Sequence, residues 1–260
     1  MPDGTESDSK RSRKDNWLRL LSSMTLAGLV SAGNGCSQEP PGQGEDSGHE
    51  RMAERQALVR ELKAKGIESK AVLDAVSGVP RHRFVPERFQ ESSYDDAPLP
   101  IGLEQTISQP YIVAFMTESL ELSRGDRVLE VGTGSGYQSA VLAMLVEHVC
   151  SVEILAPLAE RARATLAEIG VNNVEIRVAD GYKGWPEKAP FNAIIVTAAP
   201  KAVPQDLIDQ LAEGGRLVIP VGDTSVQWLM RFRKRKGRIE KETLMPVRFV
   251  PLVPGGADAN

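Results

Sequence analysis

The sequence predicts an α/β protein with a doubly wound, mostly parallel sheet, an antiparallel hairpin at one edge and helices N-terminal to the sheet. Short apolar runs alternate with helical segments in the second half of the chain, which is typical of a parallel sheet. The run at 127–131 ends in glycines at alternate positions, Gly132, Gly134 and Gly136, and an apolar helical segment follows at once. Glycines let the backbone turn tightly and approach a ligand, because they have no Cβ. Glu153, 21 residues after Gly132, lies where such a fold places a carboxylate that binds ribose.

Two helices and an irregular segment are expected before the sheet. Apolar residues predict a helix over 53–65, and Ser69 is expected to cap a second helix that ends near Val76. Prolines and glycines predict no regular structure from 92 to 110. Long irregular segments within compact domains are usually functional. A helix should then run from about 111 to 122.

The remaining elements are predicted from apolar runs between turn residues. We expect strands over 127–131, 149–154, 174–178, 191–197 and 216–221, and helices over 137–146, 156–169 and 203–212. The last two apolar runs, 226–232 and 243–250, predict the antiparallel edge hairpin, with a turn near Gly237.

Composition excludes some classes of function. The 260 residues are 41% hydrophobic, which is enough for one good core, and the net charge of −4 argues against a nucleic-acid partner. A basic run over 231–238 is interpreted as a solvated hairpin tip rather than a phosphate-binding patch. Cys36 and Cys150 form no disulfide framework, and the three histidines are scattered. We therefore predict no metal site.

Residues 1–51 differ from the rest of the chain and are expected to precede one domain over 52–260. Basic residues come before an apolar stretch at 17–30 and then Cys36, the order of an export signal with a lipid-modified cysteine. Arg19 interrupts the apolar stretch, which favours a disordered or untranslated leader instead. We expect helices and a substrate loop over 52–122 and a cofactor-binding part over 123–260. The expected location is the cytoplasm, with an exported lipoprotein as the alternative.

The spacing of the glycines favours a cationic ligand. A dinucleotide fingerprint needs a glycine at position 137, where this chain has Tyr137, and Glu130 precedes the loop. The segment 128–137, VLEVGTGSGY, resembles motif I of the S-adenosylmethionine-dependent methyltransferases. The resemblance implies that Glu130 lies near the amino acid part of the cofactor. It also implies that the glycine loop binds the cofactor through Gly132, Thr133, Gly134, Ser135 and Gly136. An NAD site and an ordinary turn are the alternatives.

Asp180 and Gly181 follow the third predicted strand. Ligands of open α/β sheets bind outside the carboxyl ends of the strands, so these residues should lie near the glycine loop and Glu153. Asp180 is a candidate for reading the adenine amino group, while Glu153 takes the ribose hydroxyls. An Asp-Gly turn without a ligand is the alternative interpretation of this pair.

A second resemblance covers roughly residues 52 to 254. The segment 92–110 reads SSYDDAPLPIGLEQTISQP, and it resembles the signature loop of the protein-L-isoaspartate O-methyltransferases. Similar likenesses are found in 190–200 (PFNAIIVTAAP), 214–222 (GGRLVIPVG) and 247–253 (VRFVPLV). The resemblance implies that Ser108 is the active-site serine and that Thr106 contacts the cofactor. Glu104 departs from the glycine that the family often has.

The resemblance implies methyl transfer from S-adenosylmethionine to the free α-carboxylate of L-isoaspartyl residues in damaged proteins, with D-aspartyl residues as a second candidate. Ser108 is then expected to hydrogen-bond the substrate carboxylate or order the loop, whereas a helix N-cap is its alternative role. A small-molecule methyltransferase and a non-catalytic cofactor-binding protein are the competing functions. The expected partners are isoaspartyl proteins and peptides, with no nucleic acid and no membrane unless the leader is lipidated. A monomer is expected.

Overall fold

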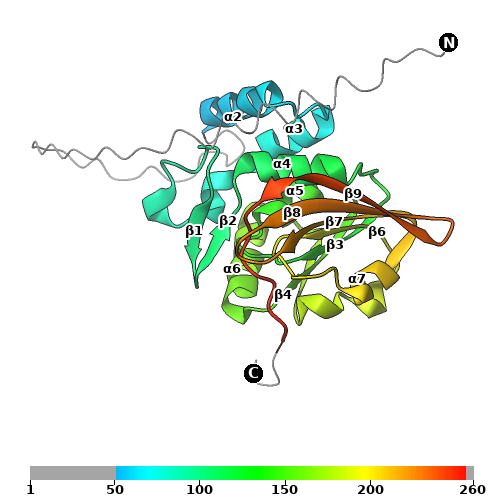
Figure 1. Cartoon of the computed structure of the whole chain (residues 1–260). Coiled ribbons are helices and arrows are strands. Elements are labelled where there is room, and N and C mark those ends of the chain that lie inside the picture. The colour runs from blue at the N-terminus through cyan, green and yellow to red at the C-terminus, as the bar shows by residue number, and fades with distance from the viewer. Residues whose placement is uncertain (1–50, 256–260) are drawn as a thin grey trace, which may run out of the picture. The chain divides into compact units, whose positions relative to one another are not determined.

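The computed structural model describes residues 51–255, and Figure 1 shows how its elements are arranged. The predictions made for the leader, including lipidation of Cys36, lie outside the described residues. Within the described part of the chain, no helix is long and apolar enough to cross a membrane.

A seven-stranded sheet forms the centre of the domain, in the order β5-β4-β3-β6-β7-β8-β9. Its first five strands run parallel, and β8 and β9 continue the sheet antiparallel at one edge. This confirms the predicted fold class. The strands are β3 (Arg127–Val131), β4 (His148–Glu153), β5 (Val174–Val178), β6 (Phe191–Val196), β7 (Leu211–Gly222), β8 (Gln227–Arg235) and β9 (Arg238–Val247).

Helices pack on the sheet and on one another. They are α2 (Met52–Ala64), α3 (Lys70–Gly78), α4 (Pro110–Ser119), α5 (Tyr137–Ala143), α6 (Ala156–Glu168) and α7 (Gln205–Asp209). The Ser69 side chain accepts a bond from the Val72 N–H, which confirms the predicted cap of α3. One core joins residues of α2 to α6, and a second joins alternate residues of β3, β4, β6 and β7 to Leu207 of α7.

The segment 92–110 is more regular than predicted. Residues Leu99–Gly102 (β1) and Gln105–Ile107 (β2) form a separate antiparallel hairpin, which lies beside the main sheet in Figure 1. Proline within a strand is found mainly at sheet edges, and β1 is such a strand, because it pairs with β2 alone. The prediction of no regular structure here was wrong.

Several boundaries also differ from the prediction, including the end of α5 at Ala143 and the range of β9, Arg238–Val247 rather than 243–250. Helix α4 ends at Ser119 rather than Leu122, and α7 covers only Gln205–Asp209. Strand β7 begins at Leu211, before the Gly214-Gly215 pair that was expected to form a turn. Its pairing with β6 is irregular between Phe191 and Ala193, so the glycines form a distortion within the strand.

The strand order creates one topological switch point. The chain moves outward from β3 through β4 to β5, and then returns to β6 on the other side of β3. In open α/β sheets a crevice forms there, outside the carboxyl ends of the strands. The loops after β3 and β6 are therefore placed to hold a ligand.

Candidate active site

A cavity of about 430 Å³ opens at the carboxyl ends of β3, β4 and β6. Its walls come from the glycine loop, the hairpin β1–β2, helix α4, the loop after β6 and the C-terminal segment 250–253. Of the predicted site residues, the cavity brings together Thr106, Ser108, Gly132, Thr133, Gly134, Ser135, Glu153 and Gly181. Glu130, Gly136 and Asp180 are not among its lining residues.

The glycine loop has backbone conformations that favour glycine over other residues. Gly132, Gly134 and Gly136 have φ values of 97°, 54° and 88°, in the left-handed region. A Cβ on Gly132 would lie 2.3 Å from Thr197 Oγ1, and one on Gly136 would lie 3.1 Å from the Ala162 Cβ. Gly132 therefore allows the glycine loop to lie against Thr197, just after β6, whereas Gly136 allows the start of α5 to pack against α6.

Glu153 is held at the cavity by the backbone. Its Oε2 accepts a bond from the Gly134 N–H at 2.8 Å, and its Oε1 accepts from the N–H groups of Ile154 and Leu155. The side chain is only 5% exposed. Because three bonds fix the carboxylate, its remaining lone pairs are aimed before any ligand arrives.

Glu130 lies beneath the loop rather than on the cavity wall. It is fully buried, and its Oε2 accepts bonds from the Ser139 and Ser151 hydroxyls. Its Oε1 has no hydrogen-bond partner among the described residues. Burial raises the pKa of the Glu130 carboxyl to about 7, although the two serine bonds oppose this shift. Glu130 is linked to the glycine loop through Ser151, whose hydroxyl contacts Thr133 Oγ1 at 2.6 Å.

Asp180 and Gly181 divide into two roles. The Asp180 Oδ1 accepts from the Tyr182 N–H at 2.9 Å and caps a short 3₁₀ turn, so this carboxylate is used locally. Gly181 lines the cavity, and a Cβ there would lie 2.6 Å from Val131 Cγ1. Asp180 thus stands at a turn, and its contact with adenine stays a prediction.

Ser108 lies on the cavity wall and is not the cap of α4. That helix begins at Pro110, and the Tyr111 N–H donates to Asp96 Oδ1 at 2.7 Å. The helix-cap role that was left open for Ser108 is therefore wrong. Thr106, two residues earlier in β2, is exposed and also lines the cavity.

Arg81 holds the ends of the segment that carries Ser108. Its Nε donates to the Ser93 carbonyl and its Nη2 to the Ser108 carbonyl, both at 2.8 Å. The guanidinium also lies 4.7 Å from the centroid of the Tyr137 ring, at the start of α5. This fully buried side chain thus joins the hairpin segment to the helix that follows the glycine loop.

The C-terminal segment and the loop after β6 complete the cavity, and sequence reasoning did not select them as site residues. The Ala199 N–H donates to the Val250 carbonyl, and the Leu252 N–H donates to the Ala199 carbonyl, which fixes 250–252 across the cavity. Thr197 Oγ1 donates to the Gly132 carbonyl at 2.6 Å. The available signal was weak: Thr197 follows a buried strand at the carboxyl end, as Glu153 does.

The cavity carries no positive side chain that would suit a pyrophosphate. Among the described residues that line it, Glu104 and Glu153 are charged and none is Lys, Arg or His. Pyrophosphate sites use helix N-termini and positive charge, so this lining disfavours a dinucleotide and suits a neutral or cationic ligand.

This sheet order, the glycine loop and the carboxylate at the end of the next strand define the class of S-adenosylmethionine-dependent methyltransferases. The family model of the protein-L-isoaspartate(D-aspartate) O-methyltransferases matches residues 53–257. The chain belongs to this family.

Named relatives agree with the family match. A protein-L-isoaspartate O-methyltransferase from Opitutus terrae is 58% identical over 203 residues, which are 77% of this chain and 87% of the relative. One from Gloeobacter violaceus is 53% identical over 74% of this chain and 94% of its own length. A solved protein-L-isoaspartate O-methyltransferase superposes with a TM-score of 0.71 at 31% identity, over 78% of this chain and 66% of that chain. A Plasmodium falciparum structure in complex with S-adenosyl-L-homocysteine gives a TM-score of 0.69 at 28% identity, over 76% of this chain and 98% of that chain.

Proposed function

We propose that this protein transfers a methyl group from S-adenosylmethionine to the free α-carboxylate of L-isoaspartyl residues in damaged proteins and peptides. The observation that carries the proposal is the position of Ser108 and the β1–β2 hairpin on the wall of the same cavity as Glu153 and the glycine loop. Family membership supports the reaction, since it rests on a match over residues 53–257.

The cofactor fits the cavity by size and by charge. A volume of about 430 Å³ lies within the range of roughly 300–1,000 Å³ that is usual for small-molecule sites. Glu153 would accept bonds from the ribose hydroxyls, the backbone of 132–135 would follow the amino acid part, and Glu130 would favour its ammonium from behind. Apolar side chains of Leu155, Leu158 and Leu252 offer a surface for the adenine ring.

The reaction needs alignment more than proton transfer. When bound, the cofactor supplies an electrophilic methyl group on a sulfonium, and the substrate carboxylate attacks it in line. A carboxylic acid with a pKa of about 4 is ionised at neutral pH, so no general base is required. Holding the two reacting groups in line can lower such a barrier by roughly 7–11 kcal/mol.

The hairpin is suited to aligning the substrate and excluding water. Leu103 and Glu104 form its tip at the cavity, and Ser108 follows its second strand. A hydroxyl at Ser108 would donate to one carboxylate oxygen of the substrate and leave the other free to attack. Arg81 holds the backbone of Ser108 in place through its bond to the Ser108 carbonyl.

The competing functions are less well supported. A methyltransferase for small metabolites needs no exposed hairpin at the mouth of its cavity, and here Leu103 is 52% exposed. A large apolar side chain beside the opening favours a polypeptide substrate. A non-catalytic binding protein is disfavoured because Ser108 faces the cavity without serving as the cap of α4.

We propose in addition that the protein acts in the cytoplasm as a monomer, without a nucleic acid or membrane partner. The net charge of −4 supports the absence of a nucleic-acid partner. The cofactor is made in the cytoplasm, which supports that location. Mass spectrometry of the protein from its own cell tests the location, and an acylated Cys36 would overturn it.

The experiment for the proposed activity follows labelled methyl groups. The full chain is incubated with methyl-labelled S-adenosylmethionine and an isoaspartyl peptide, and then with a panel of small carboxylic acids at equal concentration. We expect label in the peptide as a base-labile ester and none in the small acids. Preferential methylation of a small acid would establish the competing function.

A further inference from the structure

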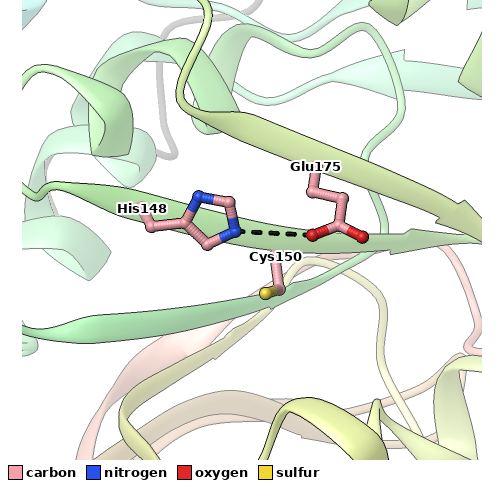
Figure 2. A group of neighbouring side chains, drawn as sticks. All are labelled: His148, Cys150 and Glu175. Carbon is pink, nitrogen blue, oxygen red and sulfur yellow. Dashed lines mark ion pairs between the residues drawn. The ribbon is translucent and has the colours of Figure 1, made fainter.

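A cluster of His148, Cys150 and Glu175 lies outside the active site. Figure 2 shows the three side chains on neighbouring strands, with a dashed line between His148 and Glu175. The His148 Nε2 lies 3.5 Å from the Glu175 Oε2. One ligand atom from each of the three residues lies within 4.8 Å of the other two. The side chains of His148 and Glu175 are 44% and 42% exposed, whereas Cys150 is buried. The cluster is therefore accessible from solvent on one side and dry on the other.

The register of the sheet explains why these residues meet. His148 and Cys150 are two positions apart on β4, so their side chains leave the same face. Cys150 is the direct partner of Glu175 on β5 in the parallel ladder. No spacing in the sequence connects Glu175 with the other two, which is why the scattered histidines and cysteines indicated no site. The cluster lies toward the N-terminal ends of β4 and β5, at the opposite end from Glu153.

The donor set is that of a borderline-soft divalent metal. Zn²⁺ takes imidazole nitrogen, thiolate sulfur and carboxylate oxygen in tetrahedral sites, with bonds of roughly 2.0–2.3 Å. Such bonds separate neighbouring ligand atoms by about 3.3–3.8 Å. The 3.5 Å between His148 Nε2 and Glu175 Oε2 already has this length, and the Cys150 sulfur lies within 4.8 Å of a ligand atom of each. We propose that His148, Cys150 and Glu175 form a zinc-type metal site with solvent as the fourth ligand.

Lys188 is the group that competes with a metal at this site. Its Nζ lies 2.8 Å from Glu175 Oε2, the same oxygen that faces His148. The Lys188 side chain is 37% exposed and extends over the Trp185 ring, so it can move into solvent without unfolding a helix or strand. A bound divalent ion would place two positive charges beside Glu175, where the Lys188 ammonium places one. It would also form bonds to His148 and Cys150 that the ammonium does not make.

The metal would bridge the edge of the sheet. β5 is the outermost strand of the parallel side and pairs with β4 alone. Because the ligands come from both strands, an ion at the cluster joins them through side chains as well as through the ladder. The inference does not rest on methyl transfer, since none of the three residues lines the active-site cavity.

Cobalt titration of the full chain tests this site. The Cys36→Ser variant is used as the background, because Cys150 is then the one cysteine left in the sequence. We expect Co²⁺ to produce the near-ultraviolet charge-transfer absorption of a cobalt thiolate, and stoichiometric Zn²⁺ to remove it. His148→Ala and Glu175→Gln should each lower the affinity for Co²⁺ by about tenfold or more, because each deletes one ligand. Lys188→Met removes the competing cation, so it should instead raise the affinity for Co²⁺ several-fold.

His148→Ala and Glu175→Gln change partly exposed side chains, so they can report on the site without disturbing the core around Cys150. Equal circular dichroism and equal affinity for S-adenosylmethionine show that they are folded. Zn²⁺ should also slow the amide exchange of β5 in the background variant and not in Glu175→Gln. A background variant with no thiolate absorption overturns the proposal. So does an absorption that persists unchanged in His148→Ala and Glu175→Gln.

Discussion

Ser108 is the residue whose role the mechanism defines most narrowly. It adds one hydrogen bond to a nucleophile that arrives already charged, so Ser108→Ala should lower the turnover number and leave cofactor affinity nearly unchanged. Losing one hydrogen bond to a charged group costs roughly 1.5–3 kcal/mol, or about one to two decades in rate. Steady-state kinetics and calorimetry measure the two quantities, with Ser108→Thr as the matched variant that keeps the hydroxyl. A loss of about five decades would indicate covalent catalysis and contradict the mechanism.

Glu130 gives a pH dependence of stability with a definite sign. Burial raises the pKa of its carboxyl from 4.5 to about 7 in the fold, so the folded state holds a proton that the unfolded chain loses. The contribution of Glu130 is therefore favourable at pH below about 4.5, and it is lost as the pH rises to about 7. Urea unfolding of the ligand-free protein at several pH values measures this effect. Glu130→Gln should remove a decline on the order of 3 kcal/mol between these limits. Parallel pH profiles for the two proteins would show that Glu130 is ionised in the fold.

The strands of the parallel sheet were predictable and the β1–β2 hairpin was not. β3 carries a buried run bounded by turn residues, and β5, the half-exposed edge strand, alternates apolar and charged residues; the predicted limits of both agree with the structure. The hairpin has no such run, since Pro100 and Gly102 lie within β1 and its three-residue partner β2 is short. Its tip has Leu103 and Glu104 with φ of 52° and 58°, which a primed turn requires. The glycine that the family often has at position 104 is explained by this backbone.

Arg81 connects Ser93, Ser108 and Tyr137, and we expect it to act by positioning Ser108 rather than by chemistry. Arg81→Lys keeps the charge and loses the fork that reaches both the Ser93 and the Ser108 carbonyls. We expect kcat/KM for an isoaspartyl peptide to fall by about ten- to a hundredfold, since small misplacements at a reacting centre are costly. Cofactor affinity should change much less. Arg60→Lys, exposed on α2, is the matched control. If both variants keep wild-type kinetics, Arg81 does not position the loop.

At the scale of the whole molecule, the sequence predicted one side of the site better than the other. The glycine loop and Glu153 follow from a local pattern, since both lie at carboxyl ends of neighbouring strands. The segment 250–253 reaches the cavity through its pairing with Ala199, and no local pattern contains that long-range contact. Glu130 was selected as part of the motif, but its place off the cavity wall, with bonds to Ser139 of α5 and Ser151 of β4, could not be predicted from the motif alone.

The domain limits lead to a prediction about truncation. A chain that starts at Met52 retains the residues matched by the family model, and it loses Arg51 with its bonds to Glu54 and the Gln90 carbonyl. We expect it to methylate an isoaspartyl peptide at the wild-type rate, with stability lower by about 1 kcal/mol. Activity and thermal unfolding of both chains measure this. A large loss of activity would show that residues 1–51 belong to the catalytic domain.

The central claim is that the nucleophile is the free α-carboxylate of an isoaspartyl residue. Three peptides of one sequence test it most directly: the isoaspartyl form, its α-carboxamide analogue and the normal aspartyl form. Methanol released from the unstable ester is measured for each peptide with S-adenosylmethionine and the full chain. We predict release from the isoaspartyl peptide alone, because the analogue lacks the nucleophile and the aspartyl form presents its carboxylate on a side chain. Equal release from the isoaspartyl and aspartyl peptides, or release from the carboxamide, would contradict the claim.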